Sequence, residues 1–157
     1  MKFVDLVKDA RVHEHRILLW PRRWKLYDTS LTIGWSAVPF RPASKSSVPD
    51  APGVYAFLIQ PGIAANLEAS YVMYVGMTDH SLRQRFAQYL IESKSPTGRP
   101  KVFMLLSLYR PYVRFFCSTV VPPNSPAAIE NELLQAFIPP ANERYPASIT
   151  RVIKAFQ

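Results

Sequence analysis

Short apolar runs mark three strands in the chain from residue 53 onward. Residues 53–59 (GVYAFLI) and 71–76 (YVMYVG) are rich in Val, Tyr and Phe, which favour strands. A connection over residues 60–70 separates them, and two neighbouring strands joined in this way most simply pair antiparallel. Residues 112–121 (YVRFFCSTVV) predict a third strand, because β-branched and aromatic residues dominate again.

Two segments between the second and third strands are predicted to be helical. The first begins at Ser81, a good N-cap residue. Its apolar stripe consists of Leu82, Phe86, Tyr89 and Leu90. The second, residues 101–109 (KVFMLLSLY), suits a buried helix or a strand, and we predict a helix.

Prolines mark the start and the end of a last helix. Asn124 or Ser125 caps it, Pro126 lies in its first turn, and Pro139 and Pro140 end it. Its predicted apolar stripe consists of Ile129, Leu133 and Phe137.

Three strands and a few helices predict a small α/β (α+β) fold with a central three-stranded antiparallel sheet flanked by helices. A stretch rich in Pro and Ser, residues 39–53 (PFRPASKSSVPDAPG), separates this pattern from the N-terminal part. We therefore expect a basic, aromatic extension and linker over residues 1–50 and one domain over residues 51–157.

The net charge of the chain indicates which classes of partner it can bind. Nineteen Lys and Arg against eleven Asp and Glu give a net charge of +8, which attracts polyanions. Nucleic acid is the first candidate partner and an anionic membrane surface the second. The apolar runs fall far short of the roughly 20 residues that cross a bilayer, and we see no signal peptide. Cys117 is the only cysteine, so no internal disulfide forms, and we expect a cytoplasmic protein with Cys117 in its core.

Several polar residues fall near one edge of the predicted sheet. They are Tyr55, Tyr74, Arg85, Tyr89, Glu130 and Asn142. Each alone has an ordinary explanation as a strand aromatic, a solvated helix residue or a turn residue. Together they suit phosphodiester hydrolysis, because an arginine grips a phosphate with paired hydrogen bonds and a carboxylate holds Mg²⁺. A tyrosine is then left as the base, and nearby positive charge is expected to lower its pKa.

The spacing of these residues resembles the GIY-YIG nuclease family. The matching pieces are Gly53-Val54-Tyr55, Tyr74-Val75-Gly76, Leu82 with Arg85 and Tyr89, and Glu130 twelve residues before Asn142. The resemblance covers roughly residues 51–143, with every expected piece in order. It implies a nuclease in which one tyrosine activates water and a single divalent ion, Mg²⁺ or Mn²⁺, takes part.

The resemblance also implies a role for each residue. Tyr55 is the base and Tyr74 its partner, and Arg85 binds the scissile phosphate. Tyr89 supports the site or contacts the leaving group, Glu130 is the metal ligand, and Asn142 supports the site. Glu132 lies close to Glu130 in sequence, so the choice of ligand rests on the distance to Asn142.

The sequence departs from the family at Met77, where many members carry a Lys or a small residue. If that Lys tunes a phenol, Arg83 or a basic residue of the N-terminal segment must replace it here. The stretch WPRRWK offers further nucleic-acid contacts at Arg22, Arg23 and Lys25, beside Arg83. Trp20 and Trp24 either stack on bases or pack as a cover.

We expect a metal-dependent DNA endonuclease. The alternatives are a nucleic-acid-binding domain without catalysis, or the same nuclease chemistry in a toxin or defence protein. The sequence leaves open whether DNA or RNA is cut, and in which form.

Overall fold

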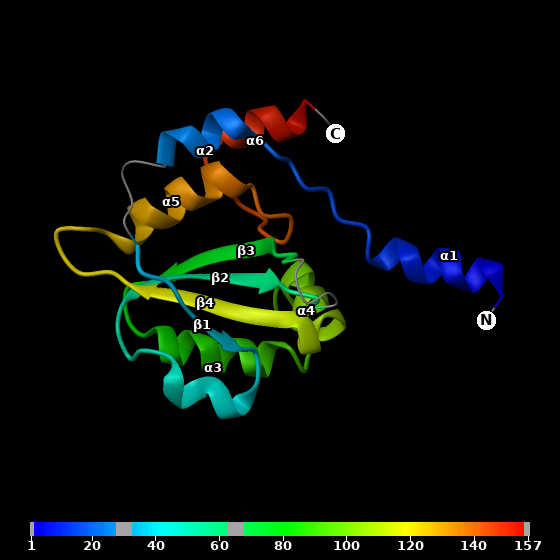
Figure 1. The fold of residues 1–157 in the computed structure, drawn as a ribbon, viewed down its shortest axis with the longest axis horizontal. Helices are drawn as coiled ribbons and strands as arrows, with labels where there is room; N and C mark the ends of the chain where they lie inside the picture. Colours follow the sequence, from blue (N-terminus) through cyan, green and yellow to red (C-terminus); the bar gives the residue numbers. More distant parts are fainter. Residues whose placement is uncertain (1, 28–32, 63–67, 156–157) are drawn as a thin grey trace.

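The sheet at the centre of the molecule has four antiparallel strands (Figure 1). The computed structural model describes residues 2–27, 33–62 and 68–155. The strands are β1 (Ser36–Pro39), β2 (Gly53–Ile59), β3 (Tyr71–Thr78) and β4 (Val113–Thr119), in the spatial order β1-β4-β2-β3. The predicted α+β class and the antiparallel pairing are confirmed. The predicted number of three strands is wrong by one.

The additional strand comes from the N-terminal segment. β1 pairs with β4, with Ser36 opposite Cys117 and Pro39 opposite Arg114. A proline is tolerated here because β1 lies at the edge of the sheet, where a missing N–H donor breaks no ladder. The N-terminal segment therefore contributes backbone to the sheet, while the domain boundary at residue 50 stays a prediction.

Helices cover both faces of this sheet (Figure 1). α3 (Leu82–Glu92) lies against one face and α5 (Pro126–Phe137) against the other, where α2 (Pro21–Tyr27) packs on α5. The remaining helices are α1 (Phe3–Val12), α2 (Pro21–Tyr27), α4 (Pro100–Leu108), α6 (Ala147–Lys154) and the short 3₁₀ helices η1 (Pro42–Ser47) and η2 (Arg110–Tyr112). α4 confirms the helix predicted for residues 101–109. In the described part of the chain, no helix is both long and apolar enough to cross a membrane.

Both predicted caps are present at the helices that flank the sheet. The Ser81 side chain accepts a hydrogen bond from the Gln84 N–H at 3.1 Å, and Ser125 accepts one from Ala128 at 3.4 Å. α3 buries Leu82, Phe86 and Tyr89 as predicted.

The predicted stripe of α5 is only partly correct. Ile129 is buried, but Leu134 is buried in place of Phe137, which is exposed. The reason is that α5 turns its Leu134 side toward Ala56 and Val75 on the sheet.

The main core lies between the sheet and α3, and it is strongly aromatic. Phe57, Phe86 and Phe115 pack there with three tyrosines, at ring-centroid distances between 4.9 and 6.4 Å. Cys117 is buried in the same core, as predicted. Of the connection predicted at residues 60–70, residues 63–67 lie outside the described part of the chain.

Candidate active site

Three tyrosines from three elements meet on the α3 face of the sheet. Tyr55 comes from β2, Tyr74 from β3 and Tyr89 from α3, and all are buried. The Tyr55 and Tyr89 hydroxyls are hydrogen-bonded at 2.9 Å. The Tyr74 ring lies 6.4 Å from the Tyr55 ring and 6.1 Å from the Tyr89 ring, centroid to centroid. The position of Tyr89 deep in this cluster favours the supporting role over contact with a leaving group.

The strand register explains how Tyr55 reaches this position. Tyr55 lies opposite Gly76 and Tyr74 opposite Phe57, so the two tyrosines are diagonal neighbours on one face. A side chain at position 76 would overlap the Tyr55 hydroxyl, with its Cβ only 2.5 Å from the Tyr55 Cζ. Gly76 therefore lets the Tyr55 ring lie directly against β3.

Gly53, which lies opposite Thr78 at the same end of this strand pair, is also required. Its Cβ would overlap the carbonyl oxygen of Ser118 on β4 and lie 2.8 Å from the Leu82 side chain. Both motif glycines thus have a steric reason in this fold.

Arg99 is a site residue that the sequence analysis missed. Its Nη1 donates a hydrogen bond to the Tyr74 hydroxyl at 2.5 Å, and its guanidinium lies 5.0 Å from the centroid of the Tyr89 ring. Nη2 and Nε donate to the two carboxylate oxygens of Glu92 at 3.0 and 3.3 Å. Gly98 makes room for this pair, because a Cβ there would lie 2.7 Å from Glu92 Oε1.

The position of Arg99 corrects the expectation attached to Met77. We expected Arg83 or an N-terminal basic residue to supply the missing positive charge near the phenols. Arg83 instead donates from Nε to the Val48 carbonyl at 2.9 Å and lies 4.0 Å from Asp50. Its guanidinium thus holds the loop before β2, and Arg99 is the cation in contact with Tyr74.

Arg85 lies on α3 and Glu130 on α5, the two helices that cover opposite faces of the sheet. The charge of Arg85 acts to lower the pKa of both Tyr55 and Glu130. Burial outweighs it at Glu130, whose pKa is raised. Glu130 in turn acts on Tyr74, whereas Glu132 acts on Tyr27 of α2. Of the two neighbouring carboxylates, Glu130 is therefore the one whose charge acts on Tyr74.

The predicted lowering of a phenol pKa does not occur in this structure. Burial raises the pKa of Tyr55, Tyr74 and Tyr89. The nearby charges of Arg85 and Arg99 oppose this effect at Tyr55, but they are too weak to reverse it. The physical reason is that ionising a phenol in an aromatic core loses its hydration, so all three phenols are neutral at neutral pH.

Asn142 fixes the strand that carries Tyr74. Its side-chain oxygen accepts from the Val75 N–H at 2.9 Å, and its side-chain nitrogen donates to the Val75 carbonyl at 2.8 Å. Val75 lies between Tyr74 and Gly76, so the Asn142 amide sets the position of both. Asn142 is buried after α5, where the sequence predicts a supporting residue.

Glu130 can supply one carboxylate ligand to a metal ion. Its carboxylate is half-buried, and within the described residues no hydrogen bond or ion pair occupies it. The same part of the chain has no group of three or more His, Cys, Asp or Glu placed to bind one ion. This donor set fits Mg²⁺ or Mn²⁺ that takes most of its ligands from water and phosphate.

The basic N-terminal residues lie on α2, away from the tyrosines. Arg22 and Lys25 are exposed, while Arg23 donates to the Gln135 side chain at 3.3 Å. The Trp24 indole N–H donates to the Ala136 carbonyl of α5 at 3.1 Å. For Trp24, the structure therefore favours the covering role over base stacking. Nucleic-acid contacts of Arg22, Arg23, Lys25 and Arg83 stay predictions.

No family model matches the chain, and comparisons with curated proteins and with solved structures found no significant match. The resemblance to the GIY-YIG nucleases therefore rests on the residues themselves and stays a prediction.

Proposed function

We propose that this protein is a metal-dependent DNA endonuclease of the GIY-YIG type. The observation that supports it most is the cluster of Tyr55, Tyr74 and Tyr89, in which the Tyr55 and Tyr89 hydroxyls are 2.9 Å apart. The charge of Arg85, on α3, acts on both Tyr55 and Glu130. A phosphate clamp, a phenol and a carboxylate near one another are the parts that phosphodiester hydrolysis needs. The net charge of +8 favours a polyanionic substrate.

In this proposal Arg85 binds the scissile phosphate. Tyr55, in its ionised form, takes a proton from the attacking water as the water oxygen bonds to phosphorus and the leaving oxygen departs. Tyr89 donates or accepts the hydrogen bond that orients the Tyr55 hydroxyl. Arg99 holds the Tyr74 hydroxyl beside them.

Glu130 is the proposed ligand of a Mg²⁺ or Mn²⁺ ion. When bound, such an ion stabilises the negative charge that develops on the phosphate and the leaving oxygen. The half-buried Glu130 carboxylate strengthens this attraction, because fewer waters screen its charge.

Nicking of a supercoiled plasmid, with and without Mg²⁺, tests the proposal. We expect Arg85→Ala to lower the rate on the order of 10²–10³-fold, as loss of a preorganised charge stabiliser does. Arg83→Ala is the matched control on the same helix and should lower it far less, because Arg83 is held by the Val48 carbonyl. Glu130→Gln should abolish nicking, and Glu132→Gln should leave it nearly unchanged. Equal rates in EDTA and in Mg²⁺ would exclude the metal.

The pH dependence tests the identity of the base. Because burial raises the pKa of Tyr55, the ionised fraction is small at neutral pH. The rate should therefore rise about tenfold per pH unit and reach no plateau below pH about 10. Tyr55→Phe keeps the ring but removes the hydroxyl, so it should abolish this dependence together with cleavage. If Tyr55→Phe and Tyr74→Phe both fold and cut at the wild-type rate, no phenol is the base.

A nucleic-acid-binding domain without catalysis is the second candidate. The observations that favour it are the burial of all three phenols and the lack, among the described residues, of any group of three or more His, Cys, Asp or Glu placed to bind one ion. Tight binding of plasmid, single-stranded and branched DNA and RNA, with no cleavage in Mg²⁺ or Mn²⁺ at any pH, would identify this function. Nuclease action as a toxin or defence protein has the same chemistry, and growth arrest on expression would distinguish it.

A further inference from the structure

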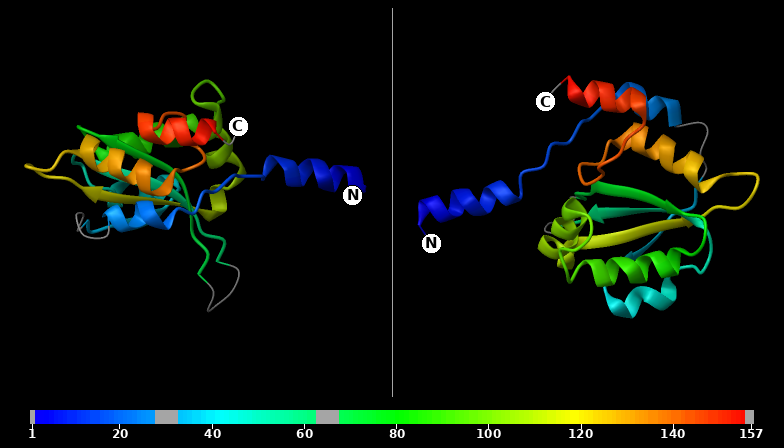
Figure 2. Two further views of the ribbon diagram at one scale, coloured as in Figure 1. Left: turned by 90° about the horizontal axis from the view of Figure 1, so that it is seen from above. Right: turned by 180° about the vertical axis from the view of Figure 1, so that it is seen from behind.

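Helix α1 projects away from the rest of the molecule. Figure 2 shows it at the end of an extended segment, in blue, with no other element beside it. Its apolar stripe consists of Phe3, Leu6, Val7 and Ala10. None of its residues is buried; Phe3 is 78% exposed and Leu6 50%. Exposed apolar stripes of this kind mark interaction surfaces.

The C-terminal end of α1, called its root below, is held in place by His13 and His15, which follow it in the chain. The Tyr109 hydroxyl lies 2.8 Å from His13 Nδ1 and 3.0 Å from His15 Nε2, within hydrogen-bonding distance of both. The His13 ring also packs edge-on against the Tyr109 ring, with centroids 5.3 Å apart. Because Tyr109 caps the end of α4, these contacts fix the direction in which α1 leaves the body.

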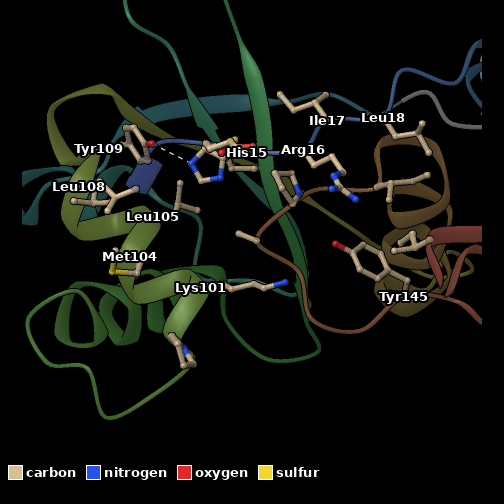
Figure 3. Close-up of a pocket in the computed structure, with 18 residues that line it drawn as sticks. His15, Arg16, Ile17, Leu18, Lys101, Met104, Leu105, Leu108, Tyr109 and Tyr145 are labelled. Atoms are coloured by element: carbon tan, nitrogen blue, oxygen red, sulfur yellow. Dashed lines mark hydrogen bonds between the residues drawn. The ribbon is translucent and has the colours of Figure 1, made fainter. Parts of the chain in front are cut away.

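A large apolar cleft lies directly beside this root (Figure 3). Its volume is about 830 Å³, and Val12, the last residue of α1, lines one side. Its apolar walls include Met73, Met104, Leu105, Leu108, Ile138 and Ile153. The basic side chains of Arg16 and Lys101 also line it.

Charges of both signs occur on α1, at Asp5, Lys8, Asp9 and Arg11, and in the cleft lining, at Glu14, Arg16 and Lys101. Asp5, Lys8 and Asp9 lie on the side of α1 opposite its apolar stripe. A helix placed with its apolar stripe in the cleft therefore keeps these three charged side chains toward solvent. α1 cannot enter the cleft of its own chain, because the segment that follows it already forms one wall and His13 and His15 fix its direction.

We propose that the chain forms a two-fold dimer in which α1 of each copy lies in the cleft of the other. The root of α1 is at the cleft, and ten residues of helix reach about 15 Å. Two copies that face each other across the cleft are therefore within reach. In this dimer the apolar stripe of each α1 and the cleft of each copy are buried together. The two contacts are equivalent, as in an isologous interface. This proposal does not depend on the nuclease activity.

Sedimentation velocity of the full chain at increasing concentration tests the dimer. We expect a concentration-dependent dimer, which Leu6→Asp weakens at least tenfold. Ile91→Asp is the matched control, because Ile91 is an apolar residue of α3 that is 72% exposed and far from α1 in sequence. Met104→Asp, which places a charge on the apolar wall of the cleft, should also weaken the dimer.

A cross-link distinguishes the exchange from other dimers. The double variant Leu6→Cys with Met104→Cys should give a covalent dimer on mild oxidation, in higher yield than either single variant. A chain that stays monomeric at high concentration, or a dimer unaffected by Leu6→Asp, would overturn the proposal. A monomer that binds anionic vesicles in a Leu6-dependent way would also overturn it, in favour of a membrane surface.

Discussion

Replacement of Arg99 by Met is the most informative single change in the site. It removes the charge and the donors but keeps an unbranched side chain that can still lie over the Tyr89 ring. Arg99 donates to the Tyr74 hydroxyl and, through two nitrogens, to Glu92. The variant therefore leaves a phenol and a carboxylate without their shared partner.

The magnitude follows from the exposure of the two charged side chains. The Arg99 side chain is 38% exposed and that of Glu92 17%, so the pair is screened more than a fully buried one. We expect Arg99→Met to lower the free energy of unfolding by about 2–3 kcal/mol, between the values for surface and buried pairs. Glu92→Gln should lower it by about 1 kcal/mol, because a neutral amide still accepts from the guanidinium. In the double variant no unpaired charge remains, so the losses should be less than additive.

Urea unfolding of the four proteins measures this coupling in a double-mutant cycle. Arg83→Met is the control, since Arg83 lies 4.0 Å from a well-exposed Asp50 and should contribute less. Titration of tyrosinate absorbance supplies a second readout. The charge of Arg99 opposes the effect of burial on the pKa of Tyr74, so its loss should raise that pKa further. Additive losses, or a loss no larger than that of Arg83→Met, would refute the role given to Arg99.

Two further changes test the packing and the charge of the site. Gly76→Ala should destabilise by about 1–3 kcal/mol, because its Cβ overlaps the Tyr55 ring, whereas Gly34→Ala meets no atom and should have little effect. Equal effects in urea unfolding would contradict this packing. Since burial raises the pKa of Glu130, wild-type stability should fall as pH rises from its usual pKa through the raised one. Glu130→Gln should therefore be at least as stable as the wild type at pH 7 in thermal unfolding; a less stable variant would contradict the desolvation of Glu130.

The strands and caps that depend on local sequence could be predicted. β2, β3 and β4 follow from β-branched and aromatic runs, and the Ser81 and Ser125 side chains cap their helices by accepting from an N–H three residues later. β1 could not be predicted in the same way. Its four residues, Ser36–Pro39, gain their strand conformation from β4, almost eighty residues away.

The site was predictable in its residue types but not in its electrostatics. The diagonal placement of Tyr55 and Tyr74 follows from the strand register. The sequence does not single out Arg99, because this residue lies in SKSPTGRP, where the pattern indicates only a break between helices. The available signal was Glu92 seven residues earlier, with Gly98 between them. The pKa of the phenols depends on the depth of burial, which no spacing of motifs records.

The Asn142 amide has a consequence beyond the position of Tyr74. β3 is an edge strand, and Val75 offers an N–H and a carbonyl on its open side. The Asn142 amide makes a hydrogen bond to each of these two groups, as a residue of a neighbouring strand would. The Ala141 N–H donates to the carbonyl of Met73 in the same way. An open edge in the apolar run YVMYVG would be a template for pairing with the same run in another molecule. The two hydrogen bonds between Asn142 and Val75 thus also protect the edge of β3 from pairing with another molecule. Selection against aggregation would therefore retain Asn142 even where catalysis did not require it.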